Sequence, residues 1–414
     1  MIEKRIHLSP GASRLCGVTA TGACLLLGTC AAIAQTVVPE TVDRKFVEEL
    51  VRRLDAQQAE IKELKAHQPA KAEDSPEATA LMRETYPKLQ FHGFGDITYH
   101  FNNETGNHNT FTLGQLDLFL TSQIAEKISI LNEFVIEGGG ADNKFGIEIE
   151  RLLLQIHAND YLNVDIGRYH TSVGYYNTAY HHGAWFQTAV GRPQILDFED
   201  GGGIIPAHNV GVSINGDIPS GRAGLRYIVE VGNGRAYHPP GTDQNLVLNV
   251  QDDNAYKAVN LALSARPDWV PGLQLGAGVY HDTVTSVIGT ARIDETMLHG
   301  YAVFKNSSWE FLSEAYAIRH EVRYGATHWT PAQFVQIARK IGDFTPYARF
   351  SYFNAAASNP VYSYIGVSGL HYGPSVGIRY DFSTFVALKA QFDHMISSGS
   401  KDIEQLTLQA AFTF

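Results

Sequence analysis

One short segment of the chain matches the sequence motif of a catalytic serine site. Residues 373–377 read Gly-Pro-Ser-Val-Gly, which matches the nucleophile elbow, a sharp turn between a strand and a helix that exposes a reactive serine. Here the segment continues into Val376, Ile378 and Tyr380, which alternate as in a strand, and no helical pattern follows. We therefore expect Ser375 to be an ordinary strand residue and predict no catalytic site.

Two other groups of side chains could hold a metal ion. His181 and His182 are adjacent, and adjacent side chains of an extended segment point in opposite directions. Asp197, Glu199 and Asp200 form an acidic cluster, but the spacing of a calcium-binding loop is missing. The sequence predicts no metal site and no cofactor.

The composition is that of a strand-rich chain. Of 414 residues, 44% are hydrophobic and only 18% are charged, with 38 Gly, 20 Tyr and 21 Phe. Gly and aromatic residues favour turns and strands over helices. Downstream of the N-terminus no apolar run is long enough for a membrane helix, which excludes a helical membrane protein.

From Lys88 onward, apolar and polar residues alternate. In the last segment Leu406, Leu408 and Phe412 alternate with Thr407 and Gln409, and the segment ends at Phe414, as in the closing strand of bacterial outer-membrane barrels. Similar alternation recurs throughout, and the predicted strands are 89–101, 113–122, 128–137, 145–157, 161–168, 207–218, 222–231, 255–265, 273–282, 296–305, 308–319, 331–341, 344–353, 370–382, 384–393 and 405–414. Each is near the roughly 9–11 residues of a tilted membrane strand.

The connections between these segments predict how the strands are arranged. Those after even-numbered strands are tight, such as 125–127 and 306–307, whereas those after odd-numbered strands are longer and polar, such as 232–254. This alternation is typical of a membrane barrel with turns at one end and loops at the other. We predict a 16-stranded antiparallel transmembrane β-barrel over residues 88–414, with apolar side chains toward lipid and polar ones toward a water-filled lumen. A bulge is expected near Arg151 and an irregularity at Pro346.

The N-terminal residues predict export. Residues 1–34 combine Lys4, Arg5 and Arg14 with an apolar stretch and Ala-Ile-Ala at 32–34, the pattern of a cleaved signal peptide. This segment carries all three cysteines, so the mature chain would have no thiol. Within residues 35–87, the stretch of about 43–67 has the heptad pattern of a short coiled-coil helix in the periplasm, followed by a Pro-containing linker.

The longest connection, about residues 170–206, follows the fifth strand and is rich in Gly, Tyr and His. A structureless loop of this length favours a functional role. Residues 161–206, with Ile-Gly-Arg-Tyr at 166–169, Gly-Tyr-Tyr-Asn at 174–177, Trp-Phe at 185–186 and Phe-Glu-Asp-Gly-Gly at 198–202, resemble Gram-negative outer-membrane porins, and among these the phosphate-selective porins O and P and their relatives. The resemblance implies a homotrimer with this third loop folded into the lumen as a constriction.

Charged residues on the strands and in the third loop are the candidate pore lining. The alternation along the strands predicts that the charged strand side chains point into the lumen. We expect the carboxylates of strands three and four and of the third loop to face a basic wall across the narrowest zone. The candidates are Glu133, Glu148, Glu150, Arg168, Arg192, Asp197, Glu199, Asp200, Arg349, Arg379 and Lys389. The chain has 32 Lys and Arg against 43 Asp and Glu, a net charge of −11, and a field of this sign favours cations at the mouth.

The sequence therefore predicts a porin for ions and small polar solutes in the outer membrane, with its N-terminal segment in the periplasm. Its partners would be membrane lipid, two further copies of the chain and the transported solutes, with no nucleic acid. Two alternatives remain open. The helix at about 43–67 could tether the outer membrane to peptidoglycan or a periplasmic protein, or the barrel could be an outer-membrane enzyme.

Overall fold

The structure, a computed structural model, describes residues 87–104, 109–139, 144–180, 183–196, 204–235, 252, 254–285 and 292–414. The chain divides into two units, Met1–Glu84 and Thr85–Phe414, and only the second is described. The predicted signal peptide, coiled-coil helix and linker lie outside the described residues. No helix in the described part is long and apolar enough to cross a bilayer.

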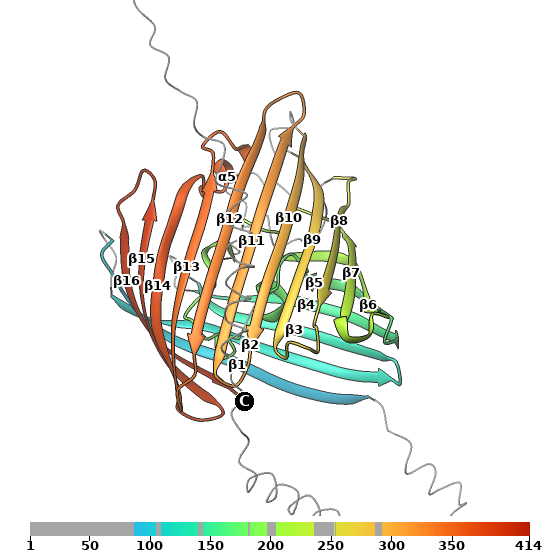
Figure 1. The fold of residues 1–414 in the computed structure, drawn as a ribbon, viewed down its shortest axis with the longest axis horizontal. Coiled ribbons are helices and arrows are strands. Elements are labelled where there is room, and N and C mark those ends of the chain that lie inside the picture. Colours follow the sequence, from blue (N-terminus) through green and yellow to red (C-terminus); the bar gives the residue numbers. More distant parts are fainter. Residues whose placement is uncertain are drawn as a thin grey trace, which may run out of the picture. The chain divides into compact units, whose positions relative to one another are not determined.

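Sixteen antiparallel strands in the described residues form one closed barrel, in which each strand pairs with its neighbours in sequence and β1 pairs with β16 (Figure 1). This confirms the predicted fold. The strands are β1 (Lys88–Asn102), β2 (Thr110–Ala125), β3 (Ile128–Gly139), β4 (Lys144–Asn159), β5 (Leu162–His170), β6 (His208–Ile218), β7 (Leu225–Gly232), β8 (Ala258–Ala265), β9 (Leu273–Thr285), β10 (Arg292–Lys305), β11 (Trp309–Val322), β12 (Thr327–Arg339), β13 (Phe344–Ala355), β14 (Gly369–Asp381), β15 (Val386–Ser397) and β16 (Ile403–Thr413).

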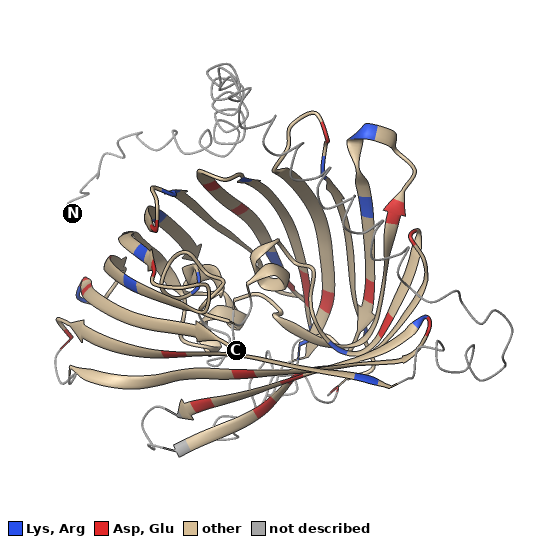
Figure 2. Cartoon of the chain, turned by 90° about the horizontal axis from the view of Figure 1, so that it is seen from below, with Lys and Arg blue, Asp and Glu red and all other residues tan. Residues whose placement is uncertain are grey.

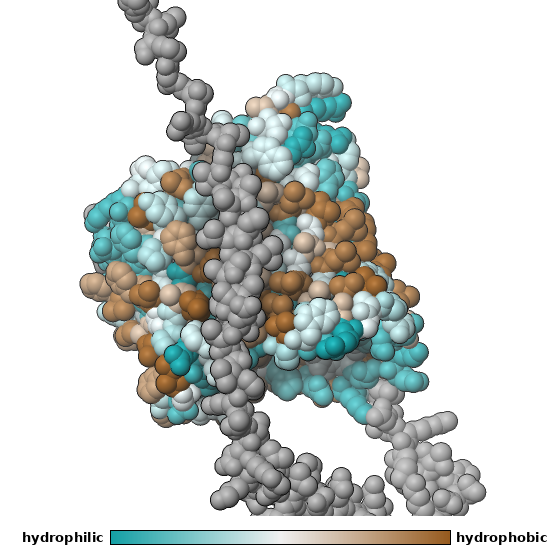
Figure 3. Space-filling model, in the orientation of Figure 1, coloured by the Kyte–Doolittle hydropathy of each residue, from teal (hydrophilic) through white to brown (hydrophobic). Residues whose placement is uncertain are grey.

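Alternation along each strand separates the two faces of the barrel wall. In β16, the side chains of Leu406 and Leu408 are 42% and 46% exposed on the outside, whereas Thr407 and Gln409 are 1% and 9% exposed on the inside. Figure 3 shows apolar residues gathered over the middle of the visible wall and hydrophilic residues toward its ends. Closure leaves no strand edge unpaired, which backbone groups within hydrocarbon require.

Connections after even-numbered strands, which we call the turn end, are short, such as 126–127 and 306–308. Those after odd-numbered strands, the loop end, include the long connections 171–207, 233–257 and 356–368. The two ends differ as predicted, although 140–143, 323–326 and 398–402 at the loop end are short too.

The predicted bulge is present, and it lies in β4. Arg151 pairs with Glu133 and Ile149 with Phe134, so Glu150 is the additional residue. At Pro346, β13 keeps its register with β14. On its other side the ladder with β12 ends at Tyr347, one residue short of the proline, so the predicted irregularity is present on that side alone.

Short helical segments lie in the connections: α4 (Tyr176–Ala179), η1 (Gln194–Leu196), η2 (Gly221–Ala223) and α5 (Pro360–Tyr364). α5 begins with a capping residue, since the Asn359 side chain accepts hydrogen bonds from the backbone N–H of Val361 and Tyr362. Pro360 follows at the first helical position, where its missing N–H costs nothing.

Candidate functional site: the loop inside the barrel

The connection between β5 and β6, residues 171–207, is the candidate functional element, and we call it the inserted loop. Of it, residues 171–180, 183–196 and 204–207 are described. Its ends are joined, because the Thr171 N–H donates to Ala207 O at 2.9 Å and the Asn177 side chain donates to Thr171 O and Ala207 O. The loop therefore leaves and re-enters the wall at one narrow neck.

Inward-facing polar side chains of the wall hold the first part of the inserted loop. The N–H groups of Tyr175 and Tyr176 donate to the Glu314 carboxylate of β11 at 3.1 and 2.7 Å. Ser172 donates its N–H to Glu230 of β7 at 3.1 Å, and the Gly174 N–H donates to His299 Nδ1 of β10 at 3.1 Å. These contacts satisfy backbone donors that the loop withdraws from water.

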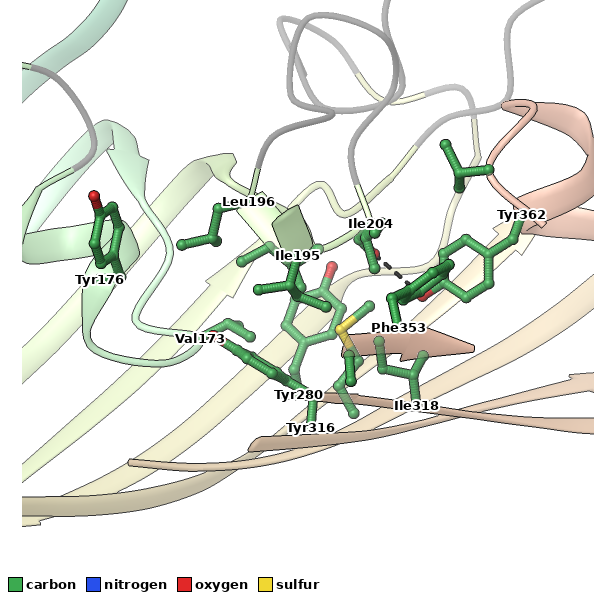
Figure 4. Packing of buried hydrophobic residues seen from close by; sticks show 14 of the residues in the cluster. Val173, Tyr176, Ile195, Leu196, Ile204, Tyr280, Tyr316, Ile318, Phe353 and Tyr362 are labelled. Carbon is green, nitrogen blue, oxygen red and sulfur yellow. Dashed lines mark hydrogen bonds between the residues drawn. The ribbon is translucent and has the colours of Figure 1, made fainter. Parts of the chain in front are cut away.

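Apolar packing joins the inserted loop to the inner face of β9–β13 (Figure 4). The loop contributes Val173, Tyr176, Tyr180, Ile195, Leu196, Ile204 and Ile205, and the wall contributes Tyr280, Val284, Ile293, Met297, Leu312, Tyr316, Ile318, Phe334 and Phe353. Each large apolar side chain buried in this way contributes about 1.5–3 kcal/mol. The expectation of a polar inner face is therefore wrong at these apolar positions of β9–β13, because there the loop, and not water, covers the wall.

The long connection 356–368 also takes part in this packing. Val361 and Tyr362 of α5 are fully buried in the same cluster, and the Tyr362 hydroxyl donates to Ile204 O at 3.2 Å (Figure 4). The returning part of the inserted loop is thus fixed by a second loop as well as by strands.

Three basic residues, which we call the basic row, donate hydrogen bonds to backbone carbonyl oxygens in the middle of the inserted loop. Arg349 of β13 donates to Gly191 O and Val190 O at 2.9 and 3.2 Å. Arg379 of β14 donates to the carbonyl oxygens at 185 and 187, and Lys389 of β15 donates to those at 184 and 189. The three side chains point inward, as strand parity predicts, but their donors bind loop carbonyls.

The loop also contacts strands at the start of the barrel. Phe94 of β1 packs against Phe186, with ring centroids 4.6 Å apart, and the Gly183 N–H donates to Asp117 of β2 at 2.9 Å. Loop segments lie inside the ring of strands (Figure 2). Contacts that run from β1 and β2 to β10–β15 mean that the inserted loop extends across the interior.

The predicted acidic residues have varied surroundings. Glu133 of β3 is buried and paired with Arg151. Glu150 is buried beside His208, with Oε2 2.5 Å from Nε2, and Arg168 donates to Glu150 O at 3.0 Å. Glu148 of β4 lies near Arg168 of β5. Arg192 is a half-buried residue of the inserted loop, and the acidic cluster of Asp197, Glu199 and Asp200 lies outside the described residues.

The tyrosines of the inserted loop remain neutral. Burial, followed by the neighbouring Tyr180, raises the pKa of Tyr175 to about 12. Burial also raises the pKa values of Tyr176 and Tyr180. These phenols add polarity without adding charge to the interior.

A hollow of about 270 Å³ lies toward the turn end, between the inserted loop and the wall. Trp185 of the loop lines it, together with Lys305, Lys340, Arg379 and Asp381 of the wall. The hollow presents both signs of charge beside an aromatic ring, which suits small polar solutes.

The serine segment at 373–377 is part of β14, paired with β13 on one side and with β15 from Ser375 onward. No helix follows it, so the elbow geometry is absent from this described strand. The pair His181 and His182 lies outside the described residues.

Several residues that hold the inserted loop were not predicted from the sequence. Glu230, His299, Glu314 and Asp117 are inward polar residues in strands of ordinary alternation, so only the loop's position distinguishes them. His170 and His208, which face each other at the neck, are separated in sequence by the entire loop. Strand register, and not sequence spacing, brings them together.

No protein-family model matches the sequence, and no curated protein does either. Solved structures do match. An anion-selective porin from Comamonas acidovorans aligns at 11% identity and a TM-score of 0.58, covering 80% of this chain and 100% of that one. OmpF of Salmonella typhi aligns at 12% identity and 0.55, covering 79% and 98%. OmpT of Vibrio cholerae, an outer-membrane protein in its trimer form, aligns at 13% and 0.53, covering 80% and 100%.

At such identities the likeness shows the fold alone. Residues 88–414 have the closed 16-stranded transmembrane barrel fold that outer-membrane porins share.

Proposed function

We propose that this protein is an outer-membrane porin, a water-filled channel for passive diffusion of ions and small polar solutes. The observation that carries the proposal is the closed barrel of sixteen strands with exposed apolar side chains outside. Such a wall is stable in lipid because all of its backbone groups are paired. A barrel of this strand number is too wide to be filled by its own wall side chains.

The inserted loop would form the constriction of this channel. In support, it contacts inward side chains on opposite parts of the wall, from Glu230 of β7 to Lys389 of β15. Its position is fixed by both apolar packing and charged donors, so it narrows the lumen as a rigid element. Solutes would pass beside it, along surfaces such as the hollow next to Trp185.

The ion preference depends on two opposing fields. The net charge of −11 favours cations near the mouth, whereas the basic row favours anions beside the inserted loop. Phosphate transport, which the resemblance to porins O and P implies, requires the second field to dominate.

Assembly as a homotrimer in the outer membrane, with the loop end outward and residues 35–87 in the periplasm, completes the proposal. An even strand number puts both ends of the barrel chain at the turn end, which agrees with a periplasmic N-terminal segment. Cross-linking in detergent or in membranes tests the trimer directly.

The test of the proposal is to add the purified full-length protein to planar lipid bilayers. A porin gives discrete conductance steps, and the reversal potential in a salt gradient gives the sign of its ion preference. The same protein denatured before addition is the control. Absence of steps in correctly folded protein would refute the porin function, and lipid hydrolysis without conductance would indicate an outer-membrane enzyme.

A further inference from the structure

Four side chains that could bind a metal ion meet at the neck of the inserted loop. They are Glu133, Glu150, His170 and His208, and we call them the His–Glu cluster. Their exposures are 0%, 4%, 7% and 1%. Ligand atoms of Glu150, His170 and His208 all lie within 4.8 Å of one another.

The backbone fixes the positions of these side chains. His170 is the last residue of β5 and His208 is the first of β6, and the two are directly paired across the strands. Directly paired side chains lie on one face with Cβ atoms about 4.5–5.5 Å apart, and the two imidazole rings are 4.9 Å apart between centroids. Glu150 is the bulge residue of β4, and a bulge redirects a side chain from the regular alternation.

The distances suit one small ion. Glu150 Oε2 is 2.5 Å from His208 Nε2, and Glu133 Oε2 is 3.8 Å from His170 Nε2. Metal–ligand bonds of about 2.0–2.2 Å in a tetrahedral site place neighbouring ligand atoms roughly 3.3 Å apart. The observed separations lie on both sides of this value, so small side-chain rotations would suffice.

The charges also suit a cation. Glu133, Glu148 and Glu150 outnumber the two adjoining guanidinium groups of Arg151 and Arg168. The second carboxylate oxygen of Glu133, Oε1, is buried and has no hydrogen-bond partner among the described residues. A buried oxygen of this kind is costly unless something binds it.

From this geometry we propose that the His–Glu cluster is a binding site for one divalent transition-metal ion of the Zn²⁺ type. Two imidazole nitrogens with carboxylate oxygens match the ligands that Zn²⁺ and its first-row neighbours prefer, whereas Ca²⁺ and Mg²⁺ favour oxygen ligands throughout. His170, His208 and Glu150 are the ligands, and Glu133 supplies the fourth position.

The ion would fasten the neck of the inserted loop. It would join β3, β4, β5 and β6 at the point where the loop leaves and re-enters the wall. Closing both ends of a long loop at a single point restricts the conformations of the whole loop. Metal binding would therefore make the loop's position more rigid, and all of the metal ligands would come from β3–β6.

The alternative is a set of buried His–Glu contacts with no metal. In that case each neutral imidazole would donate an N–H to a neighbouring carboxylate, with the two ring centroids 4.9 Å apart. One metal ion would instead accept two neutral imidazoles and the carboxylates together, and it would neutralise the excess of carboxylate charge in this buried site.

The test uses full-length protein without a histidine tag, folded in detergent, stripped with a chelator and titrated with Co²⁺ and Zn²⁺. We expect one ion per chain, with the visible absorption bands of four-coordinate Co²⁺ that Zn²⁺ abolishes. Absence of saturable binding in the unaltered protein would overturn the proposal, whatever the variants do.

Variants locate the site. His170→Ala and His208→Ala should abolish binding, and Glu150→Gln should weaken it at least tenfold. His320→Gln is the matched control, because His320 is equally buried and its Nε2 lies 2.7 Å from Glu295 Oε2, but in the described part of the chain it belongs to no group of side chains that could hold a metal ion. Binding that persists in both alanine variants, or that is lost equally in the control, would contradict this assignment. Circular dichroism confirms that each variant keeps its strands.

Discussion

At the scale of single residues, the basic row shows how inward charge is used. Arg349 directs two N–H groups at adjacent carbonyls of the inserted loop. Hydrogen bonds from a charged donor are stronger than neutral ones, and the side chain is only 6% exposed. The charge therefore supports the loop first and influences passing ions through its field.

Replacing Arg349 by Ala should loosen the inserted loop. Loss of hydrogen bonds from a charged donor costs about 1.5–3 kcal/mol, which raises the population of a displaced loop roughly tenfold to hundredfold. Single-channel conductance should become larger and noisier, and the reversal potential should shift toward cations. Planar-bilayer recording measures both.

Arg339→Ala is the control for this variant, because Arg339 points outward from β12 and stacks on Trp309 at 5.1 Å. It should conduct like the unaltered protein. Unchanged conductance and selectivity in Arg349→Ala would remove this residue from the constriction.

Residue orientation could be predicted from the sequence, but residue partners could not. Strand parity alone indicated that Arg349, Arg379 and Lys389 face inward. Their partners are carbonyl oxygens that lie 158 to 205 residues away in the sequence, from Gly191 for Arg349 to Ala184 for Lys389. Carbonyl oxygens have no sequence signature, so no pattern of side chains reveals such a contact.

At the scale of elements, the inserted loop depends on a close approach at Gly174. Its φ is +86°, and a Cβ there would lie 2.1 Å from Glu314 Oε2 and 2.3 Å from the Tyr316 hydroxyl. Only glycine permits both this backbone conformation and this contact. The following two N–H groups then reach Glu314.

Gly174→Ala should displace the inserted loop while leaving the barrel folded. The backbone strain alone is about 1–2 kcal/mol, and the methyl group also blocks docking on β11. We expect a channel with larger and less steady conductance but an unchanged strand content by circular dichroism.

Gly191→Ala separates strain from docking. Gly191 lies in the same loop with a φ of +67°, but no atom is within 4 Å of its added Cβ. It should conduct nearly as the unaltered protein does. Equal effects of the two substitutions would mean that strain, and not the contact with Glu314, determines the loop's position.

The strands were predictable because their alternation has a period of two over many residues. All sixteen were found near their predicted ranges, as was the bulge near Arg151. The apolar residues on the inner face of β9–β13 were not predicted, since Tyr316 and Ile318 alternate just as lipid-facing residues do. Only the position of the inserted loop shows which face they occupy.

At the scale of the whole molecule, the barrel closes by residues 88–414 alone. β1 pairs with β16 from Phe94 with Thr413 to Asn102 with Gln405. Gly93 and Phe414 extend this pairing with reciprocal backbone hydrogen bonds of 3.0 Å. No described strand lacks a neighbour, so the wall needs no residue from the N-terminal unit to complete its pairing.

Deleting residues 35–87 while keeping the signal peptide therefore distinguishes a channel from a tether. A closed wall with its loop held by internal contacts should still insert and should give the same single-channel conductance and reversal potential as the full chain.

If the N-terminal segment also stabilises a trimer as a coiled coil, the shortened protein should dissociate at lower denaturant concentration, because a seam of under three heptads adds stability only between chains. Conductance in planar bilayers and cross-linking of the two proteins measure these effects separately. Loss of conductance in a shortened protein that retains its strand content would mean that the pore depends on the N-terminal unit. Unchanged conductance together with loss of cell-wall co-sedimentation would assign the tethering role to residues 35–87 and transport to the barrel.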